Sequence, residues 1–503
     1  MSINGIFSRR RKSGADGEKV SCPEKINSEK LKKAFSSCCD FELREVACGG
    51  VRAHVFWIDG LVSGSSVSEC VLRPMTDETR LPRSASESEC IELIMHGAVY
   101  QCSVKRREAL DEVCSDLVSG FTAVVFDGEG AALCFETRTD NARSISEPTI
   151  EKAVMAAKDA FVETLRTNTS LVRRKLRSPR LKVWETTIGR RSGTRVCIMY
   201  IEGLTNTDTV SELRRRLGQI DIDGLVTAGA LEQRIIDEPR SPFPQLMHTE
   251  RPDKFASELL AGRVGLLADG LPIGFLLPVT LGCFLRVTED RAKHFLSASF
   301  LLILRWLSLI LAVILPALLV AVAMYHQEMI PNKLLMSMIE AKQKVPFSVS
   351  VEVLSMLVAF ELLREAGVRL PDPVGDTVSI IGALIVGQSA VEARVVSPIA
   401  VIVVATAGIC GFTQPSQDMG AALRIIRILL VCVVIVLGMF GLMLGTALIV
   451  YHLCTIDSFG VNYTSALSDG GWRRSARDFI QIPLWRDDFR ARELKTQDRR
   501  RQR

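Results

Sequence analysis

Apolar and charged residues are separated along the chain. Residues 1–297 carry most of the charge, residues 298–454 are mostly apolar, and residues 455–503 are polar again. Short apolar runs that end at glycine turns fill the first part, whereas the middle part contains runs long enough to cross a membrane. This pattern predicts α/β cytosolic subdomains followed by an α-helical membrane domain with several spans.

Two apolar runs are the clearest candidate spans. Residues 306–324 contain no charge and bring enough length to cross ~30 Å of hydrocarbon. The second run lies within residues 428–454 and is longer than the bilayer core, so we expect a helix that tilts or projects from the membrane. Three weaker apolar segments lie between them, at 346–363, 377–391 and 395–412.

Basic residues flank the apolar part on both sides. Arg286, Arg291, Lys293 and Arg305 precede the first span at 306–324, and residues 472–503 contain 11 Lys+Arg against 5 Asp+Glu. Because positive charge stays in the cytosol, both ends are expected there, which requires an even number of crossings. We therefore predict four spans, with 346–363 as a re-entrant or interfacial segment.

The front half contains an internal repeat. Residues 51–73 and 194–216 each have a strand that ends in I-D/E-G-L, a polar loop, and V-S-E at the start of a helix. Residues 120–136 and 262–278 are both strand–Asp-Gly–strand, which is typical of a tight hairpin. The near-constant offset of about 143 residues predicts two copies of one α/β subdomain.

These patterns divide the chain into six parts. The predicted parts are a mobile basic segment (1–45), a first α/β subdomain (46–150), a linking helix (151–185), a second α/β subdomain (186–297), the membrane domain (298–455) and a basic cytosolic tail (456–503).

Ionisable and polar side chains within the apolar part are candidate functional residues, because they are costly there and usually face protein or water. Glu352, Gln388 and Glu392 are candidates for a pore or polar cavity, with helix pairing or a partner contact as the alternative. A second set is expected to pair at helix ends: Glu361, Arg364, Glu365, Arg369 and Arg394. Small residues at helical spacing predict helix packing at Ala383, Gly387, Gly438, Gly441 and Gly445.

Composition excludes several other classes of protein. The net charge of +5 is small and dispersed, which does not indicate nucleic-acid binding. The 14 cysteines form no C-x-x-C pair, and no phosphate-binding, dinucleotide, zinc-protease or hydrolase motif is present. We therefore expect no enzyme, metal or cofactor, and favour a regulatory or assembly role of the front half over a small-molecule site.

Several motifs together resemble one family. These are ELLREAGVRLPDPVGDTVSIIGALIVGQSAVEARVVSP (361–398), NTSLVRRKL (168–176), GRVGLLADGLPIGFLLP (262–278) and Ser458-Phe459-Gly460 followed by Tyr463. The chain is similar over about 50–490 to the A subunit of the GerA family of spore germinant receptors. Departures occur at Ser348, Asn462 and Ala466, where the family usually has proline, and MAAKDAF (155–161) lacks the usual Gly-Pro-Arg.

The resemblance implies a multi-pass protein of the spore inner membrane. It further implies a homo-oligomer that forms a nutrient-gated cation channel together with a transporter-like, nutrient-binding B subunit and a lipoprotein C subunit, surrounded by membrane lipids. Two alternatives stay open. One is a non-conducting scaffold for the B subunit, and the other is a stage V sporulation AF-type protein that amplifies an ion signal.

Overall fold

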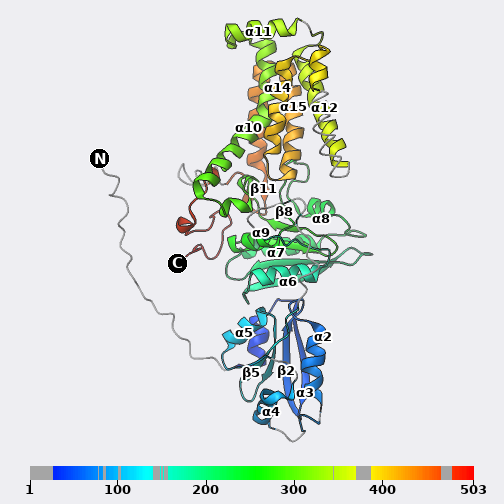
Figure 1. Ribbon diagram of the computed structural model, residues 1–503, viewed down its shortest axis with the longest axis vertical. Helices are drawn as coiled ribbons and strands as arrows, with labels where there is room; N and C mark the ends of the chain where they lie inside the picture. The colour runs from blue at the N-terminus through cyan, green and yellow to red at the C-terminus, as the bar shows by residue number, and fades with distance from the viewer. Residues whose placement is uncertain are drawn as a thin grey trace, which may run out of the picture. The chain divides into compact units, whose positions relative to one another are not determined.

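The computed structural model describes residues 26–77, 79–82, 86–99, 103–139, 148, 151, 157–343, 345–369, 387–465 and 478–502 (Figure 1). The chain divides into two compact units. The first comprises residues 1–141 and 177–180, and the second comprises residues 142–176 and 181–503.

The first unit is built on a five-stranded antiparallel sheet with the order β1-β2-β4-β5-β3. Strands β4 and β5 are buried almost throughout, which fits their continuously apolar sequences. The strands are β1 (Phe41–Cys48), β2 (Val51–Ile58), β3 (Val104–Arg107), β4 (Phe121–Phe126) and β5 (Ala131–Glu136). The helical segments are α1 (Ser28–Ala34), α2 (Gly64–Ser66), η2 (Val67–Leu72), α3 (Arg73–Thr76), α4 (Glu87–Leu93), η3 (Ile94–Ala98) and α5 (Leu110–Val118).

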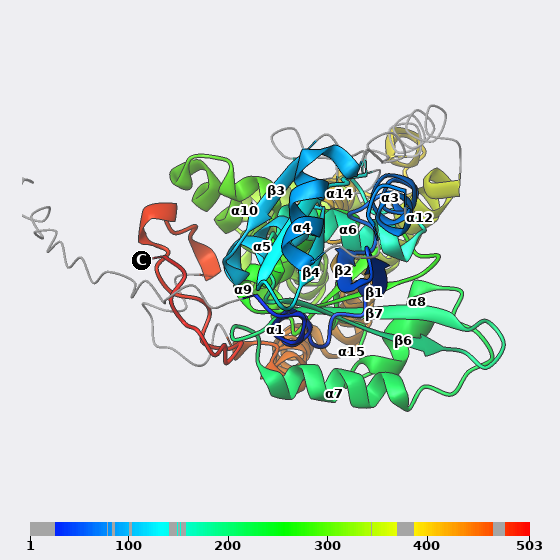
Figure 2. The same ribbon diagram turned by 90° about the horizontal axis from the view of Figure 1, so that it is seen from below.

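The second unit begins with a sheet of the same kind, with the order β6-β7-β9-β10-β8. Helices cover both of its faces, and Figure 2 shows α7 running beside β6. Its strands are β6 (Leu181–Ile188), β7 (Thr194–Ile201), β8 (Met247–Thr249), β9 (Val264–Ala268) and β10 (Gly274–Leu277). Its helices are α6 (Leu165–Lys175), α7 (Thr207–Gly218), α8 (Ala228–Ile235) and α9 (Pro252–Ala261).

The repeat in the sequence matches the repeat in the structure. The I-D/E-G-L motifs end β2 and β7, and the Asp-Gly turns join β4 to β5 and β9 to β10. Since each pair of strands has the same place in a sheet of the same order, the predicted α/β region with two related sheets is confirmed.

Each Asp-Gly turn also holds the helix that precedes its sheet. The Asp127 carboxylate accepts a hydrogen bond of 2.8 Å from the backbone N–H of Ser28, the first residue of α1. Asp269 accepts one of 2.9 Å from the N–H of Leu165, the first residue of α6. These amides have no partner inside their own helices, so the turn carboxylates act as caps supplied from the sheet.

Two predicted boundaries differ from the structure. Residues 26–45, predicted as part of a mobile segment, form α1 and the start of β1, while residues 1–25 lie outside the described part. The predicted linking helix begins only at Leu165, because residues 157–164 run without helical structure and the N–H of Phe161 bonds to Glu250 of the second unit.

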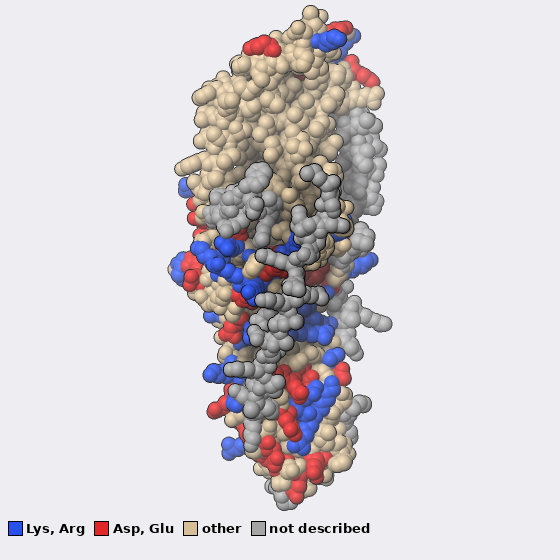
Figure 3. Space-filling view, turned by 90° about the vertical axis from the view of Figure 1, so that its left-hand side faces the viewer, with Lys and Arg blue, Asp and Glu red and all other residues tan. Residues whose placement is uncertain are grey.

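The rest of the second unit is helical and apolar. Figure 3 shows one face of it almost free of charged side chains, with charges gathered toward its ends. Among the described residues, two helices, α10 and α15, are long and apolar enough by length and composition to cross a membrane. The helices are α10 (Phe295–Tyr325), α11 (Asn332–Lys342), α12 (Val349–Arg369), α14 (Pro398–Phe412) and α15 (Gln417–Thr455), with short turns η4 (Leu281–Leu285), η5 (Thr288–Arg291), η6 (Gln327–Met329) and η7 (Leu484–Arg486) and a small hairpin of β11 (Asp457–Ser458) and β12 (Val461–Asn462).

Helix α15 reverses direction at Gly438. The φ of +61° and ψ of −140° at this residue break the helix, and a Cβ built on Gly445 would lie 2.4 Å from the Leu430 side chain. In a straight helix those residues would be ~22 Å apart. The two halves are therefore antiparallel, which corrects the prediction of a single helix within 428–454 that tilts or projects from the membrane.

Residues 346–363, which were predicted to be a re-entrant or interfacial segment, lie largely within α12. This helix has 21 residues, which corresponds to about 31 Å at ~1.5 Å per residue, and its buried Val353, Met356 and Leu357 pack into the core of the helical region. The predicted segment 395–412 corresponds to α14, whereas most of 377–391 lies outside the described residues. The number of spans stays a prediction.

Candidate functional site

Glu352 is buried at the junction of three helices, with only 1% of its surface exposed. One carboxylate oxygen accepts a hydrogen bond from Lys342 Nζ at the end of α11, at 2.5 Å. The other accepts one of 2.8 Å from the backbone N–H of Ser397, the N-cap residue of α14. Both oxygens are thus used within the chain, so in this structure Glu352 joins α11, α12 and α14.

Gln388 and Glu392 lie instead on the surface. Both belong to a helical segment at 387–392, and Gln388 Nε2 donates a hydrogen bond of 2.9 Å to Glu392 Oε1. Arg394 is also exposed and has a φ of +60°, at the turn that leads toward α14. This part of the helical region therefore presents exposed polar groups beside apolar helices.

The predicted helix-end network has a partner that was not predicted. Glu361 forms an ion pair of 2.7 Å with Arg424 of α15, and the Arg364 guanidinium lies 5.3 Å from the ring centre of Phe412. Glu365 is exposed one turn further on, and the side chain of Arg369 lies outside the described residues. Arg424 and its neighbour Arg427 were not predicted as candidate residues, although their position just before an apolar run was a usable signal.

The predicted packing glycines serve the hairpin within α15. Gly441 and Gly445 lie where its two halves meet, and added Cβ atoms would approach Val433 and Leu430 closely. Gly438 is the residue at which α15 reverses direction. Gly387 packs near Val401 of α14, whereas Ala383 lies outside the described residues.

Both ends of the α15 hairpin are attached to the second α/β subdomain. At its start, Asp418 Oδ2 lies 2.9 Å from Nδ1 of His248 on β8. Near its end, His452 Nε2 lies 2.9 Å from the hydroxyl of Ser241. Burial acts to lower the pKa of His248, but contacts with the carboxylates of Asp418 and Glu232 outweigh burial and raise the pKa to about 9. His248 is therefore a cation at neutral pH, held between two anions.

The segment after α15 folds back onto the same subdomain. The Ser458 hydroxyl accepts a hydrogen bond of 3.2 Å from the N–H of Val279 and donates one of 3.2 Å to the carbonyl of Gln245. Tyr463 is fully buried between Phe243 and Phe284. These residues belong to the Ser-Phe-Gly motif and the following tyrosine noted in the sequence.

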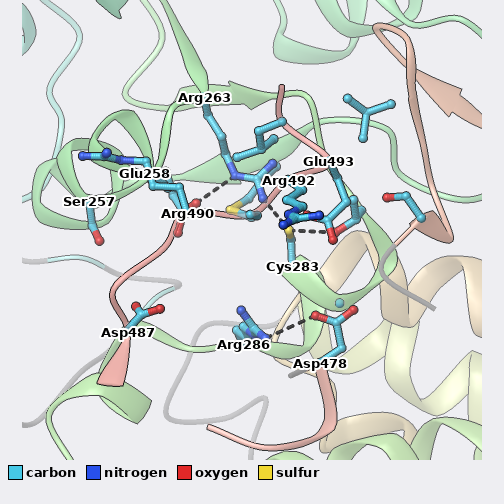
Figure 4. A pocket seen from close by; sticks show the side chains of 18 of the residues that line it. Ser257, Glu258, Arg263, Cys283, Arg286, Asp478, Asp487, Arg490, Arg492 and Glu493 are labelled. Atoms are coloured by element: carbon cyan, nitrogen blue, oxygen red, sulfur yellow. Dashed lines mark hydrogen bonds and ion pairs between the residues drawn. The ribbon is translucent and has the colours of Figure 1, made fainter. Parts of the chain in front are cut away.

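A cleft of about 990 Å³ lies between the second subdomain and residues of the tail (Figure 4). Its charges are largely paired within the chain, with Arg263 2.8 Å from Glu258 and Arg286 3.3 Å from Asp478. Burial opposes ionisation of Glu258, but Arg263 holds its pKa below the ordinary value, whereas burial raises the pKa of Asp478. In the described part of the chain, no group of three or more His, Cys, Asp or Glu side chains could hold a metal ion.

The fold thus combines two related β-sheets with an apolar helical region whose long helices suggest membrane association. The chain belongs to the Bacillus/Clostridium GerA spore germination protein family, whose model matches residues 29–493. The resemblance found in the sequence is thereby confirmed.

Individual relatives cover nearly the whole chain. It is 36% identical over 479 residues to spore germination protein KA of Bacillus subtilis (strain 168), covering 95% of this chain and 87% of that protein. It is 31% identical over 472 residues to spore germination protein GerLA of Bacillus cereus, covering 93% and 95%. It is also similar to the crystal structure of the N-terminal domain of the A subunit of the Bacillus megaterium spore germinant receptor GerK3, at 29% identity and a TM-score of 0.41, covering 51% of this chain and 96% of that one.

Proposed function

We propose that this chain is the A subunit of a nutrient germinant receptor, and that copies of it form the wall of a nutrient-gated cation channel in the spore inner membrane. A transporter-like B subunit binds the nutrient, and a lipoprotein C subunit completes the receptor. The second α/β subdomain and the tail lie in the cytosol, in accord with the basic residues that flank the apolar part.

The observation that carries this proposal is the exposed pair Gln388 and Glu392 in an otherwise apolar region. Polar side chains on the outside of membrane helices are costly unless they face protein or water. A closed ring of identical subunits would bring one such pair from every copy around a common axis. A ring of carboxylates favours cations over anions, so Glu392 is the selectivity residue that we propose.

Glu352 has a different place in this proposal. Its carboxylate is occupied by Lys342 and Ser397 of the same chain and faces the junction of three helices. We therefore assign Glu352 to the structure of the subunit. The channel and the non-conducting scaffold then differ in one measurable property, which is whether Glu392 affects ion selectivity.

The test is nutrient-triggered rubidium efflux from liposomes that contain this chain with its B and C partners. Glu392→Gln is expected to lower the cation-to-anion permeability ratio several-fold, because it removes one charge per subunit from the ring. Glu340→Gln is the matched control, since Glu340 is exposed on α11 and the substitution changes charge equally.

Three results would contradict the proposal. Efflux with the same permeability ratio in wild type and Glu392→Gln would place the ion pathway elsewhere. An assembled complex that binds nutrient without any efflux would support the scaffold. Efflux that responds to a cation signal and needs no nutrient would instead support the stage V sporulation AF-type amplifier.

A further inference from the structure

Three arginines lie together at the end of the helical region nearest the second α/β subdomain. Arg364 comes from α12, and Arg424 and Arg427 come from the first half of α15. All three interact electrostatically with one another and with Glu361, which pairs directly with Arg424. Three cations and one anion leave this arginine cluster (Arg364, Arg424 and Arg427) with an excess of positive charge.

Arg427 is the most buried member of the arginine cluster. Only 6% of its surface is exposed, and its Nε is buried with no hydrogen-bond partner among the residues that the structure describes. The Nη1 atom of Arg424 is buried and unpartnered in the same way within the described chain. A buried N–H of a guanidinium that has no acceptor costs free energy, because it has lost its hydrogen bond to water. The geometry therefore indicates a bound anion.

The guanidinium groups lie close to the end of the helical region that is nearest the second α/β subdomain. Nη1 of Arg424 would be 3.8 Å from a Cβ built on Gly420, so this side chain points back one turn toward the start of α15. That start is fixed by the contact between Asp418 and His248 of the second subdomain. Arg364 lies over Phe412, the last residue of α14. In a bilayer that covers the apolar part of these helices, side chains this close to its end would lie near the boundary between lipid headgroups and acyl chains.

The surface on these same helices is apolar. Leu362 of α12, Phe412 of α14, and Ile425 and Leu429 of α15 are all exposed. A soluble anion would gain nothing from these side chains, whereas acyl chains would cover them. Basic pockets between membrane helices on the cytoplasmic side are known to receive the headgroups of anionic lipids.

We propose that the arginine cluster binds the phosphate of an anionic phospholipid from the leaflet adjoining the second α/β subdomain. Arg427 and Arg424 donate to the phosphate oxygens from inside, and Arg364 closes the site from α12. The lipid supplies the missing acceptor, and its acyl chains lie against Leu362 and Leu429. This site is independent of the proposed ion pathway, because it is built around cations and lies at the other end of α14 from Ser397.

The experiment measures binding of fluorescent phosphatidylglycerol to the full-length chain in detergent and in phosphatidylcholine nanodiscs. Arg427→Gln and Arg364→Gln are each expected to weaken binding about tenfold, the effect of losing one charge-assisted hydrogen bond. Arg240→Gln is the matched control, because Arg240 is exposed on the loop between α8 and β8 and loses the same charge. Arg427→Lys keeps the charge, so it should bind better than Arg427→Gln and guards against a folding defect.

Three outcomes would overturn the proposal. Equal affinity in wild type and all arginine-cluster variants would place the lipid elsewhere. In phosphatidylcholine nanodiscs, inorganic phosphate is tested as a competitor of the fluorescent lipid. If it competes as strongly as phosphatidylglycerol does, the site is one for a soluble anion. Variants that change the oligomer size while phosphatidylglycerol binding stays constant would show that a carboxylate of a second copy occupies the site.

Discussion

The hydroxyl group of Tyr325, the last residue of α10, donates a hydrogen bond of 2.5 Å to the backbone carbonyl of Ile435 in α15. In a continuous helix this carbonyl would accept from the N–H of Met439. Met439 lies beyond the reversal at Gly438, so the tyrosine replaces the missing backbone donor. The end of α10 thus stabilises the tip of the α15 hairpin.

Tyr325→Phe is expected to destabilise the protein by about 1 kcal/mol, because it leaves that carbonyl without its donor and keeps the ring in place. Thermal unfolding of the full-length chain in detergent measures the change. Tyr451→Phe is the control, since Tyr451 is exposed on the second half of α15. Equal stability of the two variants would show that water replaces the hydrogen bond at no cost.

Gly438→Ala is expected to destabilise the protein more than Tyr325→Phe, by about 2 to 3 kcal/mol. The positive φ is unfavourable for alanine, and its Cβ would lie 2.9 Å from Cγ of Tyr325. Gly411→Ala is a control with the opposite expected sign, because Gly411 lies in α14 with open space around it and alanine favours helix. If both variants shifted the melting temperature in the same direction, the reversal at Gly438 would need another explanation.

His248 makes stability depend on pH. Its pKa is raised from 6.5 to about 9 in the folded chain, so its stabilising effect is complete below about pH 6.5 and is lost as pH rises through about 9. The shift corresponds to about 3 kcal/mol. Melting temperatures across this range should fall with pH in wild type and much less in His248→Gln. His96→Gln, an exposed histidine of the first unit, should follow wild type.

Substitutions of Asp127 and Asp269, the aspartates of the two Asp-Gly turns, are expected to destabilise one helix locally rather than the whole protein. Asp269→Ala removes the acceptor of the first N–H of α6, which is worth about 1 kcal/mol and should speed hydrogen exchange in the first turn of that helix about fivefold. Asp127→Ala should do the same at Ser28 of α1 and leave α6 unchanged, so each variant is the control of the other. Unchanged exchange at both helices would contradict the assigned role.

The sequence predicted the two sheets because the patterns of strands and turns involve residues that are close together along the chain. The strand–Asp-Gly–strand runs gave β4–β5 and β9–β10 directly. The capping role of the aspartates was missed because each acts on a helix about 100 residues earlier in the chain. No local pattern connects residues at that separation.

The apolar helical region was predicted less well for a different reason. Residues 428–454 contain no charge or proline, so hydropathy could not distinguish one long helix from a hairpin. Only the excess length and the glycines pointed to more than a simple span. Glu352, Gln388 and Glu392 were equivalent as polar residues in the sequence, and only the structure separated the buried Glu352 from the exposed pair.

Glu352→Gln tests that separation. The amide can still accept from Ser397, but the ion pair with Lys342 is lost, so we expect a destabilisation of about 3 kcal/mol. The double variant with Lys342→Gln should recover part of this loss, because it leaves no unpaired charge beside the junction. Thermal unfolding of the two single variants and the double variant gives the coupling energy. If the two single effects simply added, and Glu352→Gln changed ion selectivity in liposomes, Glu352 would face the ion pathway instead of joining the helices.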